Sequence, residues 1–204
     1  MWISVDWGNS AFRMRVANGD TVRPRHTWRS SDGAWPVYRG WLAGEGAAPA
    51  GSQGPFERER GERSGARSSR RHREHIHGAP RSRVVLPEGL SQADAMRQAL
   101  SKLVRRGLDE MELDPGPIPV VVSGMASSTI GIESLPYAEC PFALDGGDLV
   151  TRDYPADEVC GFHVLTVSGL CSTTSTMRGE ETLLVGLYRL HPAWFRESVR
   201  VVIP

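Results

Sequence analysis

The order of apolar and polar residues in the first 28 positions predicts three short β-strands joined by tight turns. Apolar and polar residues alternate there with the period of two that is typical of strands with one buried face. The intervening residues are small and polar, and Asn-Gly is the strongest short hairpin signal. Pro24 places the third strand at a sheet edge, because proline has no N–H to donate. We expect strands over residues 2–7, 11–17 and 21–28, and turns at Gly8-Asn9-Ser10 and Asn18-Gly19-Asp20.

A second region of regular pattern begins near Pro87. Apolar residues recur there with the spacing of one helix face, and the stripe ends near Gly107. Ser91 with Asp94 three residues later resembles a capping box at the start of a helix. These signals predict a helix whose apolar face is formed by Ala95, Met96, Leu100, Leu103 and Val104.

Two apolar runs, Val120–Val122 and Phe162–Val167, are typical of strands buried in the middle of a sheet. Each run opens into small residues, Ser123-Gly124-Met125 after the first and Ser168-Gly169-Leu170 after the second. Folds of the α/β class place ligands where a buried strand opens into such a loop. A plain solvent-facing loop explains the same composition equally well. Residues 200–203 are expected to begin one more strand.

The stretch Met177-Arg178-Gly179-Glu180-Glu181-Thr182 predicts the start of the last long helix. Acidic residues suit a helix N-terminus, where unpaired N–H groups and the helix dipole favour negative charge. Leu183, Leu184 and Leu187 then form an apolar face, and Pro192 ends the helix. A carboxylate is therefore expected at the mouth of a helix beside an arginine. An ordinary capped helix accounts for the same residues.

Composition narrows the class of protein. The chain has 204 residues with 24 Lys+Arg and 24 Asp+Glu, so its formal charge of +0 gives no reason to expect a nucleic-acid or membrane partner. Its three cysteines are an odd number without CxxC spacing, which favours reduced thiols over disulfides or a zinc site. The N-terminal residues have no basic n-region and no long apolar h-region, so we expect no signal peptide, and no apolar run approaches the roughly 20 residues of a membrane helix. We expect a soluble cytoplasmic protein.

Residues 57–83 differ in composition from the rest of the chain: they contain nine Arg, four Glu and almost no apolar side chains. Such a segment cannot bury enough surface to offset its ordering entropy, so we interpret residues 43–83 as an insertion or disordered loop. An arginine-rich nucleic-acid arm is the alternative, although the interspersed glutamates dilute its charge. His72, His75 and His77 suggest a metal site less well than a solvated loop.

The residues of the first turn are suited to binding phosphate. Small residues between two strands leave backbone N–H groups and hydroxyls facing one concavity, which suits phosphate oxygens. Asp6, at the end of a strand, can hold a hydrated Mg²⁺, which takes one or two carboxylates and keeps several waters. Candidate phosphate-binding residues are therefore Asp6, Gly8, Asn9 and Ser10, with Asp6 as the metal ligand. A plain hairpin turn is the alternative.

The predicted order of elements, a meander followed by strand–helix units, is typical of a ribonuclease-H-like α/β half. Six motifs occur along it: Asp6-Trp7-Gly8-Asn9-Ser10, Arg13, Ser123-Gly124-Met125, Pro136-Tyr137, Ser168-Gly169-Leu170-Cys171, and Met177-Arg178-Gly179-Glu180-Glu181-Thr182. In this order they resemble the 2-dehydro-3-deoxygalactonokinase family of the sugar kinase/actin/Hsp70 superfamily. The resemblance covers about residues 1–17 and 84–204. It implies an actin-like ATPase fold.

The resemblance also implies an activity, ATP-dependent phosphorylation of 2-dehydro-3-deoxy-D-galactonate at its terminal hydroxyl in D-galactonate catabolism, with ATP and Mg²⁺ as cofactors. Glu180 matches the acidic catalytic base of related kinases and would accept the hydroxyl proton. The guanidinium groups of Arg178 and Arg13 suit the substrate carboxylate or the phosphoryl group. The remaining substrate contacts are expected at Ser123, Gly124, Met125 and Gly179.

The chain ends where members of that family continue into a second phosphate loop and a nucleotide-binding half. We therefore expect a substrate domain over residues 1–42 and 84–198, with residues 199–204 beginning a missing second domain. Such a fragment is expected to show little or no kinase turnover, because one wall of the cleft is absent. The alternative is a non-catalytic remnant that binds a sugar acid or a partner. A homodimer is left open.

Overall fold

The alternating residues near the N-terminus form one half of a six-stranded sheet. The computed structural model describes residues 1–18, 26–44, 84–114, 116–159 and 161–196. Within them, β1 (Trp2–Trp7), β2 (Phe12–Ala17) and β3 (His26–Ser30) pair antiparallel, with β3 at the sheet edge. The predicted meander and its edge strand are thus confirmed. Residues 19–25, where we placed most of the second turn and the start of the third strand, lie outside the described residues.

The other half of the sheet is built around β4 (Val120–Gly124). This strand runs parallel to β1 on one side and to β7 (Val164–Val167) on the other, so the two predicted buried strands are confirmed. An unpredicted strand, β6 (Thr151–Tyr154), pairs antiparallel with β7 at the second edge. The complete order is β3-β2-β1-β4-β7-β6.

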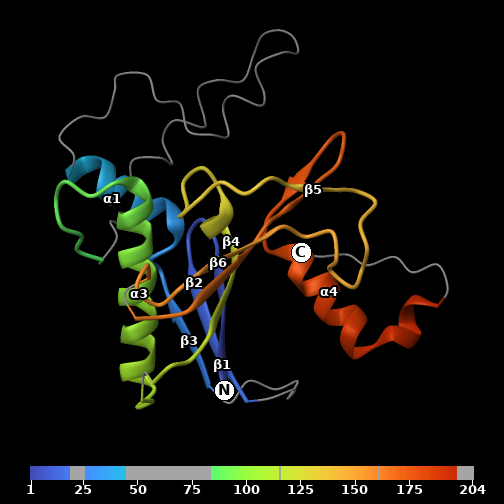
Figure 1. Ribbon diagram of the computed structural model, residues 1–204, viewed down its shortest axis with the longest axis horizontal. Coiled ribbons are helices and arrows are strands. Elements are labelled where there is room, and N and C mark those ends of the chain that lie inside the picture. The colour runs from blue at the N-terminus through green and yellow to red at the C-terminus, as the bar shows by residue number, and fades with distance from the viewer. Residues whose placement is uncertain (19–25, 45–83, 115, 160, 197–204) are drawn as a thin grey trace, which may run out of the picture.

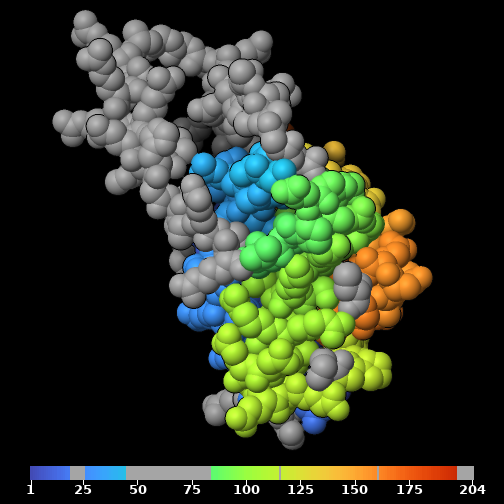
Figure 2. Space-filling model, turned by 90° about the vertical axis from the view of Figure 1, so that its left-hand side faces the viewer, coloured from blue at the N-terminus to red at the C-terminus, as the bar shows by residue number. Residues whose placement is uncertain are grey.

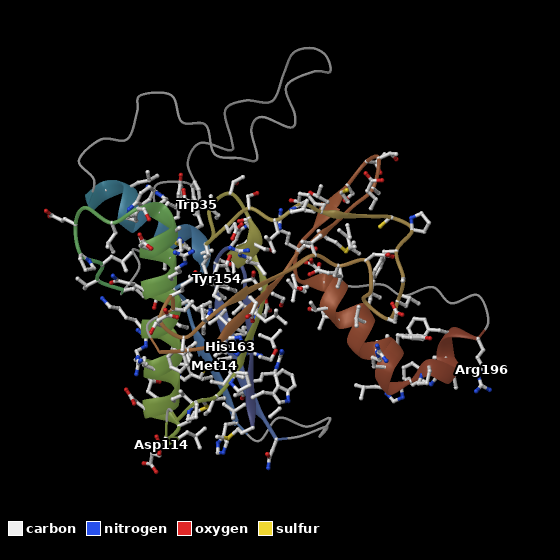
Figure 3. The ribbon with its side chains drawn as sticks, viewed as in Figure 1. Met14, Trp35, Asp114, Tyr154, His163 and Arg196 are labelled. Atoms are coloured by element: carbon white, nitrogen blue, oxygen red, sulfur yellow. The ribbon has the colours of Figure 1, made fainter. Side chains whose placement is uncertain are left out.

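Helix α3 (Gln92–Glu110) covers one face of this sheet (Figure 1). The predicted cap is present, since the Ser91 hydroxyl accepts a hydrogen bond from the Asp94 N–H at 3.2 Å. The helix does not end near Gly107, as the sequence suggested, but continues to Glu110. Gly107 lies inside the helix, and a glycine suits this position because a Cβ there would be 2.5 Å from Cε of Met14 on β2 (Figure 3).

A second helix, α1 (Ala34–Gly44), lies beside α3 at the same side of the sheet (Figure 2). No helix was predicted here from the sequence. The helix also runs through residues 43 and 44, which we had assigned to the Arg-rich segment; residues 45–83, including its arginines and histidines, lie outside the described residues. Stacked aromatic rings stabilise α1, and the Trp41 indole N–H donates to the Leu90 carbonyl at 2.8 Å.

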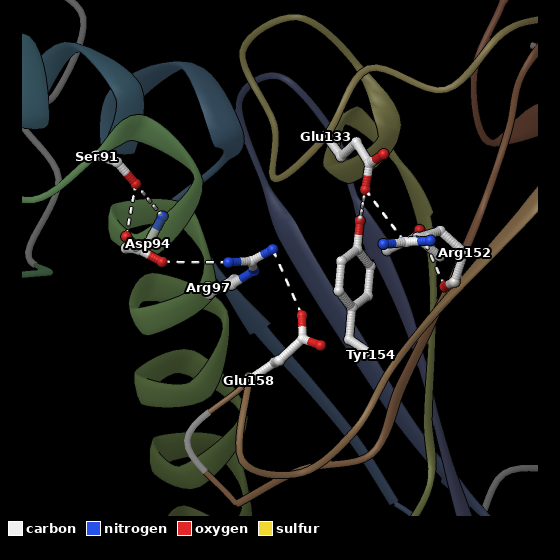
Figure 4. A network of polar contacts seen from close by, with 8 residues as sticks. Ser91, Asp94, Arg97, Glu133, Arg152, Tyr154 and Glu158 are labelled. Carbon is white, nitrogen blue, oxygen red and sulfur yellow. Dashed lines mark hydrogen bonds and ion pairs between the residues drawn. The ribbon is translucent and has the colours of Figure 1, made fainter.

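A polar network joins α3 to the edge of the sheet (Figure 4). Arg97 on α3 lies 3.2 Å from Asp94 and 3.7 Å from Glu158, which follows β6. Next to it, the buried Tyr154 hydroxyl donates to Glu133 at 2.8 Å. Burial and Glu133 together raise the pKa of Tyr154 to about 12, so the phenol stays a donor at neutral pH.

The last elements lie on the side of the sheet away from α3 (Figure 1). A short sheet of β5 (Ala138–Glu139), β8 (Leu170–Cys171) and β9 (Thr176–Met177) leads into α4 (Glu180–Leu190) and the 3-10 turn η2 (Pro192–Phe195). The start of α4 and its end before Pro192 are confirmed, but Leu183 on the predicted apolar face is 57% exposed. The predicted strand at residues 200–203 lies outside the described residues.

Among the described residues, no helix has both the length and the apolar character that crossing a bilayer demands.

Candidate active site

The site begins where β1 and β4 end side by side. Because the two strands are parallel, their C-terminal ends meet at one edge of the sheet, where Asp6 is the direct neighbour of Ser123. The 3-10 turn η1 (Met125–Ser127) follows β4, and the first residue before α4 arrives at the same place. The structure therefore brings together three segments that are distant along the chain, near Asp6, Gly124 and Gly179.

Glycines permit this close approach. A Cβ on Gly179 would lie 3.5 Å from Cα of Gly124 and 3.9 Å from Oδ1 of Asp6. Both glycines have positive φ angles, 111° for Gly179 and 89° for Gly124, which side chains with a Cβ rarely adopt. A Cβ on Gly124 would also be 2.7 Å from the Trp7 carbonyl oxygen. The two glycines thus place the start of α4 directly over the end of β1.

Asp6 already has a cationic partner in this structure. The Arg13 guanidinium, opposite Asp6 on β2, lies 2.8 Å from its carboxylate, and both side chains remain partly exposed. One carboxylate facing solvent fits the way Mg²⁺ is held by proteins, with few protein ligands and several waters. Among the described residues, no three side chains of His, Cys, Asp or Glu gather as a denser metal site would require.

The turn after β1 is held by the start of α1. The carbonyl oxygen of Gly8 accepts from the Ala34 N–H at 3.0 Å, and that of Asn9 accepts from the Trp35 N–H at 3.1 Å. Gly33 packs so tightly here that a Cβ would lie 2.3 Å from the Asn9 carbonyl oxygen. The side chains of Asn9 and Ser10 are exposed at the tip of the turn.

The guanidinium N–H groups of Arg178 donate hydrogen bonds to other residues of the chain. Its Nε donates to the Tyr137 hydroxyl at 3.0 Å, its Nη1 to the carbonyl and hydroxyl of Ser127, and its Nη2 to the Leu135 carbonyl at 3.3 Å. The guanidinium also stacks on the Tyr137 ring, 4.0 Å from its centroid. In this geometry Arg178 fastens the loop after β4 to the start of α4, and the predicted anion contact remains a prediction.

Two acidic residues open α4, and they lie in different surroundings. Glu180 is partly buried; its Oε2 atom is shielded from solvent and receives no hydrogen bond from the described residues. Glu181 is 0% exposed, and both of its carboxylate oxygens accept from the Gly179 N–H at 2.8 Å. Burial, aided by the charge of Glu180, raises the pKa of Glu181 from 4.5 to about 7, against the opposing effects of its own N–H, the Gly179 N–H and Arg178.

Two other predicted substrate-binding residues, Ser123 and Met125, make contacts within the protein. The Ser123 hydroxyl donates weakly to the Val5 carbonyl at 3.4 Å, and Met125 packs against the main hydrophobic core. Two residues at the site were missed from the sequence, Gly33 and Glu181. The spacing of Glu181 from Leu184 and Tyr188 would have placed it on the inward helix face. No sequence signal marked Gly33, whose importance depends on tertiary contact.

Comparison with known proteins gives independent evidence on the family of this chain. Residues 64–204, more than half of the chain, match the family model of 2-keto-3-deoxy-galactonokinase. No curated protein sequence matches the chain. Among solved structures, the fold is similar to that of a Sinorhizobium meliloti protein provisionally described as a 2-dehydro-3-deoxygalactonokinase, with a TM-score of 0.51 and 19% sequence identity. That match covers 93% of this chain and 43% of the other, so this chain spans less than half the length of that protein.

Proposed function

Because the chain belongs to the 2-keto-3-deoxy-galactonokinase family, we propose that it forms the substrate-binding part of a cytoplasmic kinase that transfers phosphate from ATP to 2-dehydro-3-deoxy-D-galactonate. The single observation that carries this proposal is the meeting of Asp6, Gly124 and Gly179 at one edge of the sheet, directly before Glu180. The strand order β3-β2-β1-β4-β7 supports a ribonuclease-H-like, actin-like fold for this part.

In the proposed reaction, Glu180 accepts the proton of the substrate's terminal hydroxyl. Glu180 is only partly buried and its Oε2 atom receives no hydrogen bond from the described residues, so a substrate hydroxyl that reaches this carboxylate would supply the missing donor. Catalysis of phosphoryl transfer rests mainly on positioning and charge neutralisation, so a carboxylate fixed at a helix start needs little further help. Arg13 lies near enough to Asp6 to add a positive charge beside the transferring group.

Asp6 and the turn Gly8-Asn9-Ser10 are the residues we assign to the phosphates of ATP and to Mg²⁺. Bound there, the metal ion would neutralise charge on the phosphates. The fit is supported by the exposed tip of the turn and by the solvent-facing carboxylate of Asp6. Since Arg13 pairs with Asp6, metal binding would have to compete with that ion pair.

This chain corresponds to 43% of the solved protein of similar fold, so we propose that turnover needs further sequence that supplies the adenosine site. The alternative is a non-catalytic domain that retains only sugar-acid binding or interaction. This alternative is supported by the partly exposed apolar surface of α4 and η2. Leu183, Leu190 and Trp194 there are 57%, 47% and 58% exposed.

Ligand binding tests the substrate assignment that both proposals can share, and turnover in a longer form separates the two. We expect 2-dehydro-3-deoxy-D-galactonate to raise the melting temperature of the 204-residue chain, because a ligand of the native state stabilises it, whereas galactonate serves as the matched control. In a longer form that phosphorylates the acid, Glu180→Gln should abolish ADP production without lowering the melting temperature. Unchanged turnover in that variant would remove Glu180 as the base, and no binding by either form would overturn the substrate assignment.

A further inference from the structure

Glu181 is the acidic residue at the start of α4 to which the proposed reaction gives no role. It is among the largest fully buried side chains, although carboxylates are rarely buried without a partner. Beside its own backbone N–H, its partner is the N–H of Gly179, which both carboxylate oxygens accept at 2.8 Å. The bond therefore holds the residue that touches Gly124 and lies next to Asp6.

Gly179 needs to be held from outside. Glycine has more backbone freedom than any other residue, and its φ of 111° is set by no side chain of its own. The neighbouring Thr182 hydroxyl donates to the Gly179 carbonyl oxygen at 2.6 Å. Both polar groups of Gly179 are thus bound by side chains of the first helical turn, which fixes the two peptide planes on either side of Gly179, the second of which leads into Glu180.

We propose that Glu181 is the positioning residue of this site: by holding the Gly179 N–H, it fixes the start of α4 against Asp6 and Gly124 and so sets the place of the Glu180 carboxylate. This inference rests on the proposed function, since it assigns Glu181 to the same site. Glu181 itself is 0% exposed and so has no surface to offer a substrate or a phosphate. A misplacement of about 1 Å in a catalytic group can cost about a hundredfold in rate, so a flexible glycine beside the base makes such a residue useful.

The first test observes Gly179 directly. In the 204-residue chain, the Gly179 amide resonance should shift with pH around the Glu181 pKa of about 7. In Glu181→Gln, which preserves side-chain volume but offers only one acceptor oxygen, the resonance should move and lose this pH response. Ser91→Ala is the matched control, because it removes the cap of α3 rather than a contact of Gly179. It should leave the Gly179 resonance unchanged.

The second test measures affinity for 2-dehydro-3-deoxy-D-galactonate by calorimetry. Glu181→Gln should bind the acid about tenfold more weakly, the loss expected for about 1.4 kcal/mol, and Ser91→Ala should bind it as the wild type does. Wild-type affinity in Glu181→Gln together with an unmoved Gly179 resonance would overturn the positioning role. If the wild type binds no acid, the proposed function fails, while the Gly179 resonance still decides the role of Glu181. Should Glu181→Gln not fold, a wild-type Gly179 resonance that is insensitive to pH overturns the inference.

Discussion

At the scale of single residues, the site depends on two glycines without side chains and on one buried carboxylate. Gly124 and Gly179 have no side chain: a Cβ on Gly124 would lie 2.7 Å from the Trp7 carbonyl oxygen, and both residues have positive φ angles that side chains with a Cβ rarely adopt. Glu181 contributes a carboxylate in a place that water does not reach. The same position therefore combines close packing with a buried titratable group, and each has a measurable consequence.

The buried carboxyl of Glu181 should make stability depend on pH. Its pKa rises from 4.5 in the unfolded chain to about 7 in the folded protein, so the folded state favours the protonated form. This contribution is fully present below pH 4.5 and is lost as the pH rises through 7, and the shift corresponds to about 3 kcal/mol. Urea unfolding of wild type and Glu181→Gln should therefore give a difference in unfolding free energy that changes over this range. Parallel pH curves for the two proteins would contradict the prediction.

Gly179→Ala should destabilise the chain by about 1–3 kcal/mol, because a Cβ at φ 111° is strained whatever space surrounds it. Gly186, in the same helix, provides the control: a Cβ there meets nothing within 4 Å, and Gly186→Ala should stabilise the chain by about 0.5–1 kcal/mol. Thermal unfolding of the two variants measures the opposite signs. Equal effects would show that the backbone of Gly179 is free to relax.

At the scale of elements, the start of α1 supports the turn after β1. The Ala34 and Trp35 N–H groups bind the carbonyl oxygens of Gly8 and Asn9, and the Trp7 indole donates to the Asp32 carbonyl at 3.2 Å. Asp32, 1% exposed, in turn lies 3.2 Å from Arg106 on α3. A loop proposed to bind phosphate is thus connected through α1 to the main helix of the fold.

This support predicts a large effect of one methyl group. Gly33→Ala should cost about 1–3 kcal/mol and shift the amide resonances of Asn9 and Ser10, because the added Cβ would lie 2.3 Å from the Asn9 carbonyl oxygen. In the same segment, Gly40→Ala adds its Cβ to open space within α1 and should stabilise the chain slightly. If both variants unfold at the wild-type urea concentration, the turn does not depend on α1.

Elements with a strong local pattern could be predicted from the sequence, and those that depend on tertiary contact could not. The alternation of apolar and polar residues predicted β1 and β2, and the cap at Ser91 predicted the start of α3, because each signal depends only on residues close together in the sequence. Gly107 was misread as a helix end, since its role is to make room for Met14 from a distant strand. At the site, the motifs predicted which segments meet, but they did not reveal that Arg178 is bound by Ser127 and Tyr137.

At the scale of the whole molecule, helices α3 and α4 are packed very differently. Nine residues of α3 are buried against the sheet, whereas Glu181 is the buried residue of α4. The body of α4 contacts the loop before β6, where Arg189 donates to the Asp145 carbonyl at 3.4 Å and Val185 lies beside Gly146. The proposed catalytic carboxylate therefore lies on the less firmly packed part of the chain.

Local opening should follow this difference, because segments with few buried contacts exchange their amide hydrogens at lower free energy than the core. We expect the amides of α4 to exchange faster than those of α3 in native-state hydrogen exchange. Saturating 2-dehydro-3-deoxy-D-galactonate should slow exchange in the first turn of α4 and leave α3 unchanged, since a ligand that contacts Glu180 binds only the closed form. Slowing in both helices would indicate global stabilisation instead. Protection of free α4 equal to that of α3 would contradict the idea that α4 is the weakly held wall of the site.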